Sequence, residues 1–135
     1  MIKEITKFKD KNIEEIFNAY PKEVKEKLLS IREMIFEVSM QTKAIWSIEE
    51  TLKWWEPSYV SKIWCTVRID KVHWSDTDFS VFFNCKTTLI STFKEIFWNQ
   101  FNYSWNRALI FNINDTIDTD NLKHCIYLSL TYFQK

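Results

Sequence analysis

Apolar residues near the start of the chain recur at helical spacing. Five of them step by four, three, four and three residues and so share one helix face: Val24, Leu28, Ile31, Ile35 and Val38. This spacing predicts a helix over 21–40, with Pro21 at its first position, where the missing N–H costs nothing. A shorter apolar pattern predicts a preceding helix over 12–19.

The spacing changes to a period of two in the middle of the chain. Residues 66–70 and part of 79–83 alternate apolar and polar side chains, which is typical of strands with one buried face. We expect one or two further strands over 50–53 and 58–60, broken by Pro57. The middle of the chain is therefore predicted to form a sheet.

The last part of the chain predicts helix, hairpin and helix. Thr87 or Thr88 can cap a helix that runs to about residue 97. Segments 100–103 and 108–111 then predict a β-hairpin. A final helix follows, and its cap and apolar stripe are Asp118 or Thr119, then Leu122, Ile126, Leu130 and Phe133.

This order of elements predicts the fold class. Because the strands are consecutive rather than alternating with helices, we expect an α+β fold, an antiparallel sheet with helices packed on one face. A doubly wound α/β fold is not expected. No repeat or linker divides the 135 residues, so residues 1–135 are expected to form one domain.

Composition argues against two classes of binding partner, nucleic acids and membranes. Eighteen basic and 18 acidic residues give a net charge of zero, which offers no global field for nucleic acid. No segment approaches the roughly 20 apolar residues that a membrane helix needs, and the N-terminus does not resemble a secretory signal. Three widely spaced cysteines suit reduced thiols in a cytosol. We expect a cytoplasmic monomer or homodimer without membrane or nucleic-acid partners.

Catalytic motifs do not appear in the sequence. A chain without glycine has no phosphate-binding loop, and the cysteines lack zinc-site spacing. His124 and Cys125 are neighbours in a predicted helix, where side chains point about 100° apart, so a buried thiol beside a boundary imidazole is expected. His73 is expected to be solvated.

Cys85 is the most chemically suggestive thiol. It lies where a strand gives way to a predicted helix N-terminus, a setting that lowers a thiol pKa, and Lys86 follows it. One hypothesis is a thiol-dependent enzyme at Cys85. The competing interpretation is a buried cysteine at the end of a strand.

Acidic residues gather on the first two predicted helices. Their carboxylates could hold a hard cation, although interleaved lysines favour a solvated surface of mixed charge. The acidic residues are Glu14, Glu15, Glu23, Glu26, Glu33 and Glu37.

Residues 49–59 form the densest polar and aromatic patch. Charges of both signs, three aromatic residues and a proline can stack against and hydrogen-bond a small ligand. The alternative is an edge strand whose charges pair with neighbours.

At this patch the sequence resembles the YdhG-like family of domains of unknown function. The motifs that carry the resemblance occur in order: Glu50-x-Leu52-Lys53-Trp54-x-Glu56-Pro57-Ser58-Tyr59, Thr66-Val67-Arg68-Ile69, Phe83-x-Cys85-x-Thr87-x-Leu89, Asn106-Arg107-Ala108, His124-Cys125 and Leu130-Thr131-Tyr132. The resemblance implies a frataxin-like fold, and some related proteins are described as iron chaperones. Relatives often carry a histidine after the tyrosine, where this chain has Phe133.

The tryptophans depart from this pattern. The chain has seven tryptophans and no glycine, where about nine glycines would be usual for its length. The resemblance implies that Trp54 is a true tryptophan and that Trp55, Trp64 and Trp105 stand where glycine is expected. The other three lie at turn-like positions or at the ends of elements, where glycine would be natural: Trp46, Trp74 and Trp98. The hypothesis is that UGA codons meaning glycine were translated as tryptophan, and engineered substitution is the rival explanation.

These observations predict a non-enzymatic module that binds a small ligand or a partner, with no cofactor. Its expected ligand-binding residues are Lys53, Trp54, Glu56, Tyr59, Arg68, Cys85 and Arg107. A frataxin-like iron carrier, with iron as its cofactor, and a thiol-dependent enzyme at Cys85 are the two alternatives.

Overall fold

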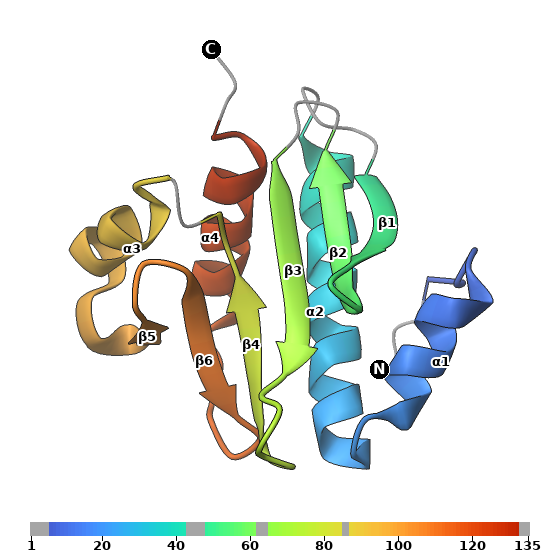
Figure 1. Cartoon of the computed structure of the whole chain (residues 1–135). Helices are drawn as coiled ribbons and strands as arrows, with labels where there is room; N and C mark the ends of the chain where they lie inside the picture. Colours follow the sequence, from blue (N-terminus) through green and yellow to red (C-terminus); the bar gives the residue numbers. More distant parts are fainter. Residues whose placement is uncertain (1–5, 43–47, 62–64, 85–86, 133–135) are drawn as a thin grey trace.

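The computed structural model describes residues 6–42, 48–61, 65–84 and 87–132. Within them, four α-helices accompany a six-stranded sheet of order β1-β2-β3-β4-β6-β5, in which every pair of neighbouring strands is antiparallel. Helices α2 and α4 cross the back of the sheet (Figure 1). The prediction of an α+β fold with an antiparallel sheet is confirmed.

The two N-terminal helices form as the apolar spacing predicts. Helix α1 spans Lys11–Ala19, and the Asp10 side chain caps it by accepting a 2.8 Å hydrogen bond from the Asn12 N–H. Helix α2 spans Lys22–Gln41. Pro21 precedes the helix as its N-cap, because its backbone is still extended (ψ 144°), so the prediction that it is the first helical residue is wrong by one position.

Strands β1 (Ile48–Lys53) and β2 (Glu56–Ser61) form a hairpin with a two-residue turn. The prediction that Pro57 breaks the strand is wrong, because Pro57 lies inside β2 opposite Leu52. In a two-residue hairpin the pair next to the turn exchanges the hydrogen bonds, and the following pair does not. The missing N–H of Pro57 therefore costs no bond to β1.

The remaining elements follow the predicted order. Thr88 precedes α3 and makes no capping bond through its side chain, but Thr87 Oγ1 accepts a 3.3 Å hydrogen bond from the Leu89 N–H at the start of the helix. The Asp118 side chain caps α4 through the Asn121 N–H at 3.0 Å. The bounds are β3 Thr66–Lys71, β4 Asp78–Phe82, α3 Leu89–Phe97, the 3₁₀ turn η1 Trp98–Gln100, β5 Asn102–Ser104, β6 Ala108–Asn112 and α4 Thr119–Leu130.

The core lies between the sheet and helices α2 and α4. The predicted apolar stripe of α2 is buried along its length, and so are the described members of the α4 stripe, while Phe133 lies outside the described residues. Alternate residues of the central strands face these helices: Val67, Ile69, Phe79, Val81, Leu109 and Phe111. The opposite face of the sheet is left without a helix across it (Figure 1).

Four tryptophans occupy the left-handed region of backbone space, and they are the only described residues that do. Their φ values are 56° at Trp54, 64° at Trp55, 49° at Trp98 and 53° at Trp105. This region is costly for a residue with a Cβ and costs glycine nothing. The four indoles are also at least three-quarters exposed, so packing does not compensate for the strain.

Among the described residues, no helix is both long and apolar enough to cross a membrane.

Candidate functional site

The helix-free face of the sheet carries a hollow of about 810 Å³, here called the open-face pocket. Strand register brings its residues together from distant parts of the chain. Arg68 on β3 pairs with Phe82 on β4, which in turn pairs with Ala108 on β6, next to Arg107 in the β5–β6 turn. The lining residues include Glu56, Arg68, Asp70, Phe82, Arg107 and Ile110.

Two arginines, Arg68 and Arg107, line this pocket. Among the described residues, neither Arg68 nor Arg107 makes a side-chain hydrogen bond or an ion pair within bonding distance. The Arg68 guanidinium carbon lies 5.5 Å from the centroid of the Phe82 ring, a cation–π distance that holds the side chain along the sheet. The donors of both guanidiniums are therefore available to a ligand.

Glu56 supplies the acidic counterpart. Its Oε2 atom is buried and has no hydrogen-bond partner in the described structure. Burial raises the pKa of the Glu56 carboxyl, against the opposing effect of the nearby Arg68 charge, and Asp70 adds to the rise. A buried acceptor without a donor is costly. Because Glu56 is only half-buried and lines the pocket, the accessible part of its carboxyl can accept a hydrogen bond from a ligand.

Asp70 fixes one wall of the pocket. Its Oδ1 accepts a 2.7 Å hydrogen bond from the Tyr20 hydroxyl, and its Oδ2 lies 3.2 Å from Nε2 of His73. Burial, with the Asp70 charge beside it, raises the pKa of the Tyr20 phenol well above its ordinary value, so the phenol stays a donor. The His73 side chain is 80% exposed, which agrees with the expected solvated histidine.

Of the residues predicted to bind a ligand, three line the open-face pocket: Glu56, Arg68 and Arg107. Lys53 ends β1 directly opposite Glu56, and Trp54 protrudes from the hairpin turn, so both lie beside the pocket but outside its lining. Cys85 lies outside the described residues, and its predicted reactivity stays a prediction.

Tyr59 does not belong with these residues. It is fully buried on the helix-facing side of β2, where its hydroxyl donates a 2.7 Å hydrogen bond to Glu50 Oε2 and its ring meets Phe36 edge-on. Residues alternate between the two faces of a strand, so Tyr59 cannot share the face of Glu56. Its expected ligand contact is corrected to a core contact.

Sequence reasoning missed the buried arginine beneath this strand. Arg32 of α2 is fully buried, donates to both carboxylate oxygens of Glu50 at 2.6 and 3.0 Å, and lies 3.9 Å from the Phe8 ring centroid. The charge of Glu50 therefore pairs with a neighbour, as the edge-strand interpretation of residues 49–59 anticipates. The one available signal was that Arg32 directly follows Ile31 of the apolar stripe.

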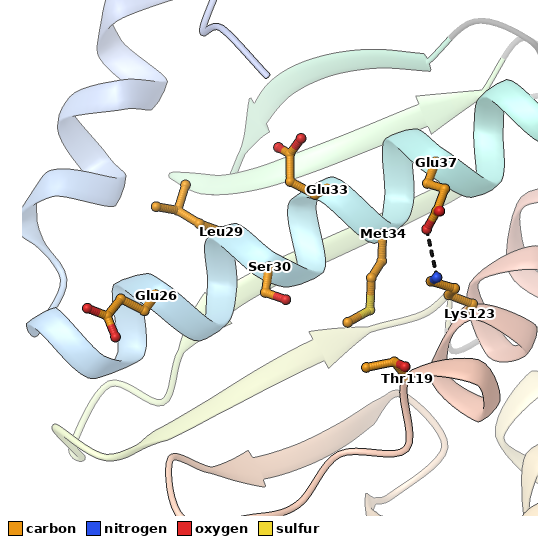
Figure 2. A pocket seen from close by; sticks show the side chains of 8 residues that line it. All are labelled: Glu26, Leu29, Ser30, Glu33, Met34, Glu37, Thr119 and Lys123. Carbon is orange, nitrogen blue, oxygen red and sulfur yellow. Dashed lines mark ion pairs between the residues drawn. The ribbon is translucent and has the colours of Figure 1, made fainter. Parts of the chain in front are cut away.

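A second hollow, of about 450 Å³, lies between α2 and α4 and contains part of the acidic helix surface. Figure 2 shows Glu26, Glu33 and Glu37 spaced along α2, with carboxylates pointing in different directions. Glu37 is paired with Lys123 of α4 at 2.7 Å, and Glu33 with Arg32 at 3.1 Å. Across the described residues, no three Asp, Glu, His or Cys side chains gather in a metal-binding arrangement.

The two cysteines in the described part of the chain are buried, as expected for structural thiols. Burial raises the pKa of Cys125 to about 12, which keeps its thiol protonated. His124 packs edge-on against Phe97 with ring centroids 5.6 Å apart.

Comparisons with protein-family models, with curated proteins and with solved structures find no match to this chain.

Proposed function

We propose that this chain is a small cytoplasmic, non-enzymatic binding domain that holds a small ligand in the open-face pocket. The observation that carries the proposal is the convergence of Glu56, Arg68 and Arg107 in one hollow. They come from three separate segments: Glu56 belongs to the polar and aromatic patch of residues 49–59, and Arg68 and Arg107 belong to two later motifs of the resemblance. We also place the chain with the YdhG-like, frataxin-like domains, on the motifs given above.

The composition of the pocket supports the binding of a small ligand. The pocket combines charged groups with an apolar floor from Phe82 and Ile110, the usual composition of small-molecule sites. Preformed donors without internal partners are suited to recognition.

The test is a thermal-shift screen against a library of small metabolites of positive, negative and zero charge. Ligand binding to the folded state raises the melting temperature by mass action. We expect hits that are lost in Arg68→Ala and Arg107→Ala and kept in Lys9→Ala, a matched change of an exposed cation before α1. Hits that survive both arginine substitutions would overturn the proposal.

We further propose that glycine is the intended residue at six tryptophan positions, decoded from UGA. The left-handed backbone at Trp55, Trp98 and Trp105 supports this proposal, since glycine adopts it without strain. Trp54 has the same backbone, so φ alone does not separate it from Trp55, and its assignment as a true tryptophan rests on the resemblance. Trp74 is not left-handed, and positions 46 and 64 lie outside the described residues.

The gene sequence decides this second proposal. The proposal predicts UGA at codons 46, 55, 64, 74, 98 and 105 and UGG at codon 54. Mass spectrometry of the protein from its native host should find glycine at the six positions, and indoles there would refute the idea.

The iron-carrier alternative draws no support from the described carboxylates, which are dispersed or paired with cations. Calorimetric titration with ferrous iron tests it directly, because a carrier on these helices requires micromolar binding.

A further inference from the structure

The charges of the open-face pocket define the chemistry of its ligand. We infer that the pocket binds a small oxyanion, a carboxylate or a phosphate, that also carries a hydroxyl or amino group. This inference rests on the proposed binding function and specifies its ligand class.

The anionic part of the ligand follows from Arg68 and Arg107. Guanidinium groups bind carboxylate and phosphate oxygens through paired N–H donors, and each such bond is stronger than one between neutral groups. In this structure Arg68 is flanked by Phe82 rather than by a bonded carboxylate, and Arg107 lies in the β5–β6 turn at the rim. The N–H donors of both guanidinium groups are therefore available to a ligand, although the chain as a whole has a net charge of zero.

Strand geometry allows the two arginines to act on one group. Arg68 aligns with Phe82 and then Ala108 across two strand spacings, or roughly 10 Å between backbones. Arg107 adjoins Ala108, and its carbonyl accepts a 2.7 Å hydrogen bond from the Phe83 N–H, which anchors the turn to β4. Two extended arginine side chains can bridge such a gap around an oxyanion.

The donor group of the ligand follows from Glu56. Glu56 is half-buried and lines the pocket, and its carboxyl lies close enough to Arg68 for their charges to interact. An oxyanion bound at Arg68 would repel an ionised Glu56 unless the ligand places a hydroxyl or ammonium hydrogen between them. A bare oxyanion should therefore bind more weakly than one with an adjacent donor.

Three other cations differ from Arg68 and Arg107 in making bonds within the protein. Arg32 is saturated by Glu50 and Glu33, and Lys123 is paired with Glu37. Lys71, which also lines the open-face pocket, donates to three backbone carbonyls, at Val72, His73 and Ser75. Arg68 and Arg107 are the pocket cations that these internal contacts leave for a ligand.

The test is a titration of isotope-labelled protein at pH 8 followed by NMR, with five probes: glycerol 3-phosphate, methyl phosphate, L-lactate, acetate and glycerol. We expect glycerol 3-phosphate or L-lactate to shift the Arg68 and Arg107 Nε–H signals. Glycerol 3-phosphate should bind more tightly than methyl phosphate, L-lactate should bind more tightly than acetate, and glycerol should not bind. Comparison of the phosphate pair with the carboxylate pair shows which anion the pocket prefers.

Substitutions make the outcome specific. Arg68→Lys and Arg107→Lys keep the charge but lose the paired donors, and each should weaken binding at least about tenfold, while Lys9→Ala should leave it unchanged. Glu56→Gln should reduce the advantage of the hydroxylated probes. The same titrations on Trp105→Gly show whether the exposed indole at the rim obstructs entry.

Two results would overturn the inference in different ways. In the first, none of the four oxyanions binds to the parent chain or to Trp105→Gly, but a neutral or cationic molecule from the screen binds at Arg68 and Arg107. The inferred ligand class is then wrong, and the proposed binding function stands. If no probe and no library compound perturbs this face in either protein, both proposals fail.

Discussion

Nε of the fully buried Arg32 lies 2.6 Å from Glu50 Oε2, and this ion pair joins helix α2 to the edge strand β1. The same carboxylate oxygen accepts the Tyr59 hydroxyl, so one acidic residue of the hairpin satisfies two buried donors. The hairpin that carries Glu56 is therefore fixed to the helical layer from its inner face. Removal of Arg32 would leave Glu50 without its cationic partner, whereas removal of Glu50 would leave Arg32 paired with Glu33 alone.

Replacement of Arg32 by methionine is expected to destabilise the fold by about 3–5 kcal/mol, because Glu50 would keep a buried, uncompensated charge. Urea unfolding of Arg32→Met measures this loss. The double variant Arg32→Met/Glu50→Leu should lose less than the sum of the single changes, since it removes both charges together. Additive losses would show that the two residues act independently.

Glycine at the left-handed positions is expected to stabilise the protein. Trp55→Gly, Trp98→Gly and Trp105→Gly each relieve a strain of about 1–2 kcal/mol, partly offset by the greater freedom of glycine in the unfolded chain. A net gain of up to about 1 kcal/mol per site is predicted from urea unfolding. Trp74→Gly is the matched control, because Trp74 is as exposed but not left-handed, and it should give no gain.

Alkylation should find Cys125 inert. Its buried thiol has a pKa raised to about 12, so at pH 8 almost no thiolate exists to react with iodoacetamide. Peptide mapping after a timed reaction measures each cysteine separately. Rapid labelling of Cys125 under native conditions would contradict the described burial.

The same shift predicts how stability depends on alkaline pH. The folded state keeps the Cys125 proton at pH values where the unfolded state, with a pKa near 9, releases it. Folding stability should therefore fall as pH rises from about 9 towards 12. Cys125→Ser should flatten this part of the profile, and an unchanged slope would assign the dependence to other groups such as Tyr20 and Tyr59, whose phenol pKa values are also raised.

Much of the fold could be predicted from the sequence because burial imposes a period. The stepping of Val24, Leu28 and Ile31 predicts α2 to within a residue at each end, and alternation predicts β3. The sequence does not show that Pro57 can lie inside a strand, because its effect depends on which side of the strand its missing N–H faces. That register is set by the hairpin turn and not by the proline itself.

The site could be predicted only in part. The polar and aromatic patch points to Glu56, and the motifs of the resemblance point to Arg68 and Arg107; strand register then brings the three to one pocket. Tyr59 belongs to the same motif but faces the helices, since a shift of one residue along a strand reverses its face. Arg32 was overlooked because a charged residue next to an apolar stripe is normally solvated, and only tertiary structure reveals its carboxylate partner.

The most direct test of the central claim is the NMR spectrum of labelled protein with the strongest ligand from the metabolite screen. The account predicts shifts at the Arg68 and Arg107 side chains and along the outer face of β2, β3 and β4, with binding weakened at least about tenfold in Arg68→Ala. Shifts confined to the groove between α2 and α4, around Met34 and Lys123, would contradict it.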